Sequence, residues 1–149
     1  MPFRFPLRAL QRVRAVYERR ESQRLGALTH QLLSAQKQLA ALKQGRLEDA
    51  GSLEKHLQQG MTGAEVQFQV LCSSMRLRRI KAAAQIVESV SQQRQRQLIE
   101  YRHAKQKLEV IERLYQRQLS VYRRTQARRE QQQATDMFIL RSQVANDGQ

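Results

Sequence analysis

Residues 77–122 read LRRIKAAAQIVESVSQQRQRQLIEYRHAKQKLEVIERLYQRQLSVY, without proline or glycine. Through this stretch apolar side chains recur in alternating steps of three and four residues. Side chains with this spacing stay on one side of a long helix and face a partner helix. We therefore expect a long helix that packs on a second one. The positions on this track are Leu77, Ile80, Ala84, Val87, Ser91, Arg94, Leu98, Tyr101, Lys105, Leu108, Glu112, Tyr115, Leu119 and Tyr122.

The partner helix is predicted upstream, where residues 25–53 follow the same alternation. Two such helices joined by a short connection form an antiparallel helical hairpin. The predicted fold class is therefore all-α, with two long helices in an antiparallel coiled-coil hairpin and the second helix overhanging at its C-terminal end. The partner positions are Leu25, Leu28, Leu32, Ala35, Leu39, Leu42, Arg46, Asp49 and Leu53.

The connection is predicted near residue 60. Gly60 can take the left-handed angle that ends a helix, and Thr62 with Glu65 three residues later forms a capping box that starts the next helix. Pro6 suits the first position of helix 1. We expect a single domain over 1–149, with helix 1 at about 6–58, the turn at about 59–62, helix 2 at about 63–141 and a frayed tail at 142–149.

The N-terminal part of helix 1 is expected to continue the apolar face through Leu7, Leu10, Val13 and Tyr17. Phe3 and Phe5 precede this helix. They either pack against the second helix of the hairpin or insert into another protein.

The two helices differ in length. Antiparallel pairing about the turn places Pro6 opposite about Tyr115, so beyond about residue 118 helix 2 has no intrachain partner. This overhang contains Arg123, Arg124, Arg128 and Arg129. The apolar run 137–140 then follows, either as part of a solvated end or as an anchor for another protein.

A second apolar row lies beside the main track on the first half of helix 2, and it makes the stripe wider than two helices need. Either helix 1 packs broadly there, or the row is left for a partner. Its members are Phe68, Leu71, Met75, Ala82, Ile86 and Val90.

The chain has 149 residues and a formal net charge of +14. Residues 1–24 carry seven arginines and two glutamates, and residues 100–130 carry nine basic and four acidic side chains. In a hairpin these two segments lie side by side, so one end of it is strongly basic. An anionic partner surface is therefore expected.

The residues indicate a protein that is not an enzyme. The three histidines are scattered and the single cysteine, Cys72, has no neighbouring ligand, so we expect neither a metal nor a cofactor. There is no glycine-rich phosphate loop and no Ser, His and acid arrangement. We expect no small-molecule substrate.

Several residues also carry a family resemblance. The opening Phe3-Arg4-Phe5-Pro6-Leu7, followed by Leu10 and Arg14, and the second helix resemble the FliJ family of the bacterial flagellar type III export apparatus. The residues of the second helix that share in this resemblance are Leu108, Ile111, Glu112, Leu114 and Arg117.

The resemblance implies a helical hairpin similar to the gamma subunit of rotary ATPases. It implies a non-enzymatic central stalk in the cytoplasm, peripheral at the inner face of the cell membrane. The partners implied are the export ATPase FliI and the export gate protein FlhA, with FliH and export chaperones as further candidates. The stalk would enter the ATPase ring with its basic terminal end and couple the ring to the gate.

On this hypothesis two groups of residues are candidates for binding. The ring-binding candidates are Phe3, Phe5, Arg8, Arg12, Arg117, Arg123, Arg124, Arg128 and Arg129. The candidates for binding the gate or another partner are Leu39, Leu42, Phe68, Leu71 and Met75. The alternative function is a basic coiled-coil adaptor that binds nucleic acid or an anionic membrane surface, with nucleic acid the less expected ligand because no reading module is recognisable.

Overall fold

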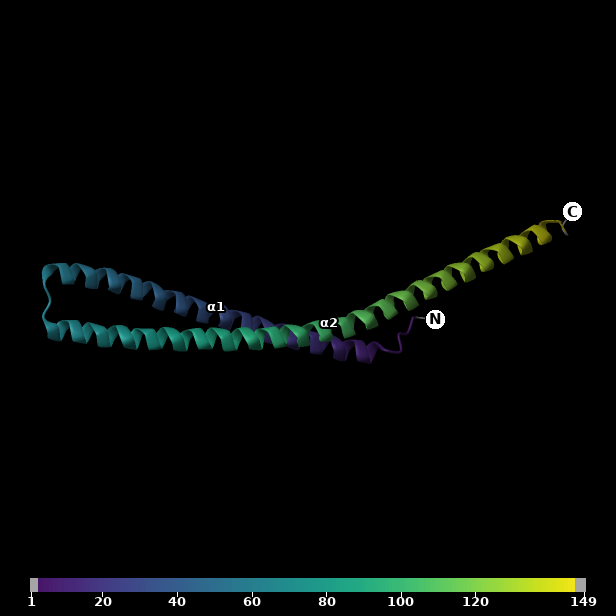
Figure 1. Ribbon diagram of the computed structural model, residues 1–149. Helices are drawn as coiled ribbons and strands as arrows, with labels where there is room; N and C mark the ends of the chain where they lie inside the picture. Colours follow the sequence, from purple (N-terminus) through teal and green to yellow (C-terminus); the bar gives the residue numbers. More distant parts are fainter. Residues whose placement is uncertain (1–2, 147–149) are drawn as a thin grey trace. The chain divides into compact units, whose positions relative to one another are not determined.

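The computed structural model describes residues 3–146. Helix α1 (Arg8–Gln59) and helix α2 (Gly63–Asn146) account for all regular structure in this range, and they run antiparallel and pack against each other (Figure 1). This confirms the predicted all-α hairpin. The chain divides into two compact units: the terminal unit, Met1–Glu18 with Ala104–Gln149, and the turn unit, Arg19–His103.

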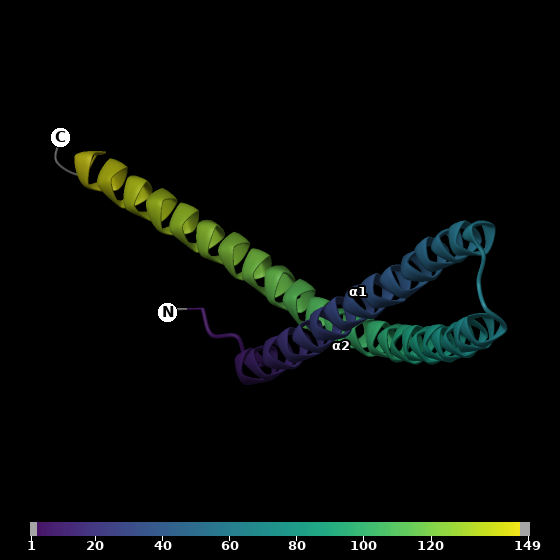
Figure 2. The same ribbon diagram turned by 90° about the vertical axis from the view of Figure 1, so that its left-hand side faces the viewer.

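The turn between the helices forms as predicted (Figure 2). Gly60 has a φ of +93°, a left-handed conformation that is strained for residues with a Cβ. The amide of Thr62 donates to Oε2 of Glu65 (2.8 Å), and the amide of Glu65 donates to Oγ1 of Thr62 (3.4 Å). This reciprocal pair is the capping box, and it satisfies two amides at the start of α2.

The helix bounds differ from the expected ones at both chain ends. Helix α1 begins at Arg8 instead of Pro6, because residues 6–7 form a turn in which the Arg8 amide donates to the Phe5 carbonyl (3.3 Å). Of the expected frayed tail, residues 142–146 are helical and 147–149 lie outside the described residues. That the chain forms a single domain stays a prediction.

In the turn unit, polar contacts between the helices fix the antiparallel register. The Nε of Arg94 donates to Oγ1 of Thr29 (3.1 Å). The Gln97 side-chain amide donates to the backbone carbonyl (3.4 Å) and to the carboxylate of Glu21. The seam predicted on α1 is confirmed at seven positions, which are buried or half-buried: Leu25, Leu28, Leu32, Ala35, Leu39, Asp49 and Leu53. The prediction is wrong for Leu42 and Arg46, which are exposed.

The seam on α2 follows the predicted track over much of its length. Four predicted positions are exposed instead: Leu77, Ala84, Lys105 and Glu112. At each of them the preceding residue faces the partner helix, and one of these, Ile111, is among the most buried side chains (6% exposed). An α-helix has 3.6 residues per turn, so a 3.5-residue track drifts by about 20° per heptad and cannot remain on the contact face.

The apolar face predicted for the start of α1 is wrong. Leu7, Leu10, Val13 and Tyr17 are between 36% and 52% exposed, whereas Gln11, Arg14, Ala15 and Glu18 are half-buried. Eight residues separate Tyr17 from the seam residue Leu25, and eight residues turn a helix about 80° beyond two full turns. The early row and the later seam therefore cannot share one face.

Candidate functional site

In the terminal unit, the two N-terminal phenylalanines pack on tyrosines of α2. The Phe5 ring lies edge-on to Tyr115, with centroids 5.2 Å apart, and Phe5 is only 7% exposed. The Phe3 ring lies 5.7 Å from Tyr115 and 5.4 Å from Tyr122. Of the two alternatives, packing within the hairpin is therefore the observed one. Both residues hold the start of the chain on α2.

Three of the arginines predicted to bind the ATPase ring lie in the terminal unit near its packed end and are accessible to solvent. Arg8, Arg12 and Arg117 are exposed. Within residues 3–146, their guanidinium groups take part in no ion pair or hydrogen bond. Such groups retain their charge and their donors for an anionic partner.

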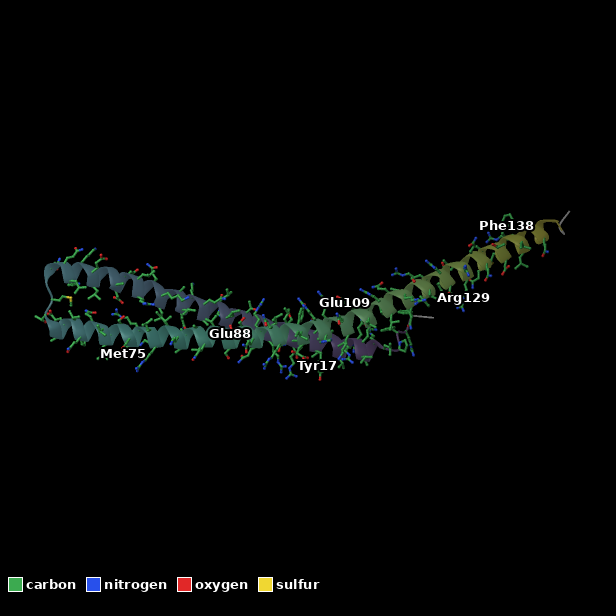
Figure 3. All side chains as sticks on the ribbon, viewed as in Figure 1. Tyr17, Met75, Glu88, Glu109, Arg129 and Phe138 are labelled. Carbon is green, nitrogen blue, oxygen red and sulfur yellow. The ribbon has the colours of Figure 1, made fainter. Side chains whose placement is uncertain are left out.

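Beyond Gln126, every described side chain of α2 through 143 is exposed. The predicted overhang is therefore present, but it starts later than residue 118, because Phe3 extends the packing to Tyr122. Arg123, Arg124, Arg128 and Arg129 all lie on exposed positions of this helix. Arg129 is labelled in Figure 3. The exposed helix combines cationic side chains with an apolar end, where Met137 and Phe138 are 58% and 73% exposed.

In the turn unit, most of the second apolar row of α2 is exposed, whereas its last member, Val90, is half-buried. Phe68, Leu71, Met75 and Ile86 are between 48% and 64% exposed, so α1 does not cover them. Of the two α1 candidates for the same surface, Leu42 is partly accessible at 37%, whereas Leu39 is half-buried in the seam. The accessible surface therefore lies mainly on α2.

The structure also shows an apolar groove that the sequence pattern did not predict. Its volume is about 330 Å³, and it lies in the turn unit. Val66, Val70 and Leu77 share a helical face roughly opposite Phe68 and Met75, so the groove and the second apolar row border different sides of α2. The residues that line it are Leu53, Leu57, Val66, Gln69, Val70, Ser73, Ser74 and Leu77.

The described residues contain no arrangement with evident catalytic chemistry. No group of three or more His, Cys, Asp or Glu side chains within 3–146 is placed to hold a metal ion. Among the carboxyls of residues 3–146, only that of Glu65 has a clearly shifted pKa, which is lowered by the hydrogen bond from the Thr62 amide and then by the Thr62 side chain. This shift belongs to the helix cap.

Comparison with known protein families gives a match over most of the chain. A family model described as "Flagellar FliJ protein" matches residues 3–142. No curated protein and no solved structure matches the chain.

Proposed function

Because the chain belongs to the FliJ family of flagellar proteins, and so has a role related to flagellar export, we propose that it is the central stalk of the flagellar export ATPase. In this proposal the terminal unit binds inside the ring formed by FliI, and the turn unit contacts the export gate protein FlhA. The chain performs no catalysis itself. It works in the cytoplasm at the inner face of the cell membrane, where FliH and export chaperones are further partners.

The observation that carries the ring-binding step is the exposed extension of α2. Residues 127–143 project no side chain into the hairpin, so this part of the helix is available to another protein. Its four arginines at 123, 124, 128 and 129 suit a channel lined by carboxylates. Each exposed ion pair contributes little, but several together set orientation and association rate.

The extension also needs a partner on physical grounds. A solvated helix without a packed face gains little from tertiary contacts, and most helix stability in proteins comes from such packing. Ile139 and Leu140, at 46% and 60% exposed, would be buried inside a ring together with Met137 and Phe138. Their burial adds an apolar contribution to the electrostatic one.

ATP turnover by the cognate ATPase tests this proposal. Addition of the chain should raise turnover and promote ring assembly. Changing Arg123, Arg124, Arg128 and Arg129 to Glu should return both to the level of the ATPase alone. A matched control changes Arg78, Arg79, Arg96 and Arg102 to Glu; these are four exposed arginines of the turn unit, and the control should retain most of the stimulation. Equal loss in both variants would show an effect of net charge alone and would count against the proposal.

We assign the gate contact to the second apolar row of α2 and to the partly exposed Leu42 of α1. Changing Phe68, Leu71 and Met75 to Ser removes three exposed apolar side chains without opening the seam. We expect loss of binding to the cytoplasmic part of FlhA, while the helical circular dichroism signal is retained. The control changes Leu33, Leu47 and Leu57 to Ser, which are exposed leucines of α1. Retained gate binding in the first variant would exclude this placement.

A further inference from the structure

An exposed apolar band lies on the first turns of α1. Its members, Leu10, Val13, Val16 and Tyr17, are 40%, 51%, 65% and 52% exposed. Residues 10, 13 and 17 share one side of the helix, and Val16 lies beside them because it follows Val13 by three positions. All four belong to the terminal unit.

Helix α2 adds apolar side chains to the same side of this unit. Val110 and Leu114, at 57% and 39% exposed, directly precede the seam residues Ile111 and Tyr115. On α1, Val13 likewise directly precedes a half-buried seam position. In an antiparallel pair, the positions that precede the seam on both helices border the same side. The band on α1 and the pair on α2 therefore form one apolar side.

The opposite side of the terminal unit is polar. It carries a shallow groove of about 480 Å³. Glu109 and Glu112 lie on this side, and Glu109 pairs with Arg113 (3.8 Å). Tyr17, from the apolar side, and Glu109 are both labelled in Figure 3. The groove is lined by Gln11, Glu109, Glu112, Arg113, Tyr115 and Gln116.

Basic side chains border the apolar side. Arg12 is exposed and lies four positions before Val16, and the exposed Arg8 lies four positions before Arg12, so both border the band on α1. On α2, Lys107 is exposed and precedes Val110 by three positions. Long basic side chains can lie along an apolar surface and carry their charge to its edge.

An apolar band with a basic border is typical of a helix that lies in the plane of an anionic membrane surface. We propose that the first turns of α1 bind anionic phospholipids in this way, with the valines and Tyr17 at the boundary between headgroups and acyl chains and the arginines on the phosphates. Each Arg near such a surface adds to the electrostatic attraction. A nucleic acid would use the arginines but not the band. Neither described helix has a stretch apolar and long enough to cross a bilayer.

This inference does not rest on the proposed function: it concerns the chain before it binds the ring, because the same terminal unit cannot lie inside a ring and on a membrane at once. Flotation of the full chain with vesicles of phosphatidylcholine and phosphatidylglycerol in equal parts tests it. We expect binding at physiological salt, none to pure phosphatidylcholine, and a sharp loss at about 1 M salt, where the Debye length falls to about 3 Å.

The variant Val13→Ser, Val16→Ser, Tyr17→Ser separates the band from the charge. It should weaken partitioning at least about tenfold, because three buried apolar side chains are lost. The control Leu33→Ser, Leu47→Ser, Leu57→Ser should bind like the original chain. If the first variant binds equally well, the arginines act alone and the proposal is overturned. The proposal is also overturned if the chain does not bind the anionic vesicles. This holds if the chain binds duplex DNA instead, or if sedimentation shows a dimer that depends on the same band.

A fluorescent reporter provides a second measurement. The chain contains no Trp, so V13W reports from this band alone. We expect a blue shift on adding the anionic vesicles, and no shift for L33W, which probes an exposed position of the turn unit. Equal shifts for both would overturn the proposed orientation of the helix.

Discussion

The Phe5 ring meets the Tyr115 ring edge-on, with centroids 5.2 Å apart and an angle of 84° between the ring planes. This arrangement directs the positive edge of one ring at the negative face of the other. Phe5 precedes α1 and Tyr115 lies on α2, so the contact ties the start of the chain to the second helix. Phe5 and Ile111 are the most buried side chains described in the terminal unit.

Phe5→Ala should therefore destabilise the hairpin by about 3 kcal/mol, as truncation of a buried aromatic side chain generally does. Urea unfolding followed by circular dichroism measures this. Phe138→Ala is the matched control, because Phe138 is 73% exposed, and its effect should remain within about 0.5 kcal/mol. Equal effects of the two changes would contradict the packing described for Phe5.

The pair formed by Arg94 and Thr29 gives a second prediction. Thr29→Val removes the acceptor of the Arg94 Nε–H in a part-buried seam and should cost about 1–2 kcal/mol. Adding Arg94→Leu should recover at least half of this loss, since an apolar pair leaves no donor unpaired. A double-mutant cycle in urea measures the coupling. Strictly additive effects would show that the hydrogen bond has no energetic role.

The capping box gives a pH dependence. Because the Thr62 amide lowers the pKa of Glu65 in the folded chain, the ionised carboxylate stabilises the fold at neutral pH. This contribution is complete above the unfolded pKa of about 4.3 and is lost as the pH falls through the lower folded value. The melting temperature of Glu65→Gln should thus be below that of the original chain at pH 7, and the difference should shrink below about pH 4. A difference that is constant with pH would exclude ionisation as its origin.

Much of this architecture could be predicted from the sequence because local signals and periodicity agree. Gly60, Thr62 and Glu65 specify the turn by backbone conformation and capping, which need no tertiary information. The leucines from Leu25 onward predict the α1 seam, since their spacing is regular over four heptads.

The exposed band on α1 and the burial of Ile111 could not be predicted in the same way. A fixed heptad track does not include the rotation that accumulates along an α-helix. For this reason it placed Tyr17 in the seam, and it predicted a seam position at Glu112 where Ile111 is the buried residue. The groove beside Val70 depends on residues from both helices, so it requires their relative rotation. Of the predicted binding residues, Leu39 and Phe5 are covered within the hairpin, because both also satisfy the apolar spacing of the interface.

In the proposed function, the exposed extension of α2 enters the export ATPase ring. The single cysteine allows a direct measurement, because Cys72→Ser gives a background without cysteine. In this background Ala127→Cys is the test variant, and Gln58→Cys, near the turn, is the control. Each new cysteine is labelled with a photo-crosslinker and irradiated with the purified ATPase. Both positions are exposed. The account predicts a crosslink to the ATPase from position 127 and none from position 58. ATPase stimulation without a crosslink from 127, or crosslinking from 58 alone, would contradict it.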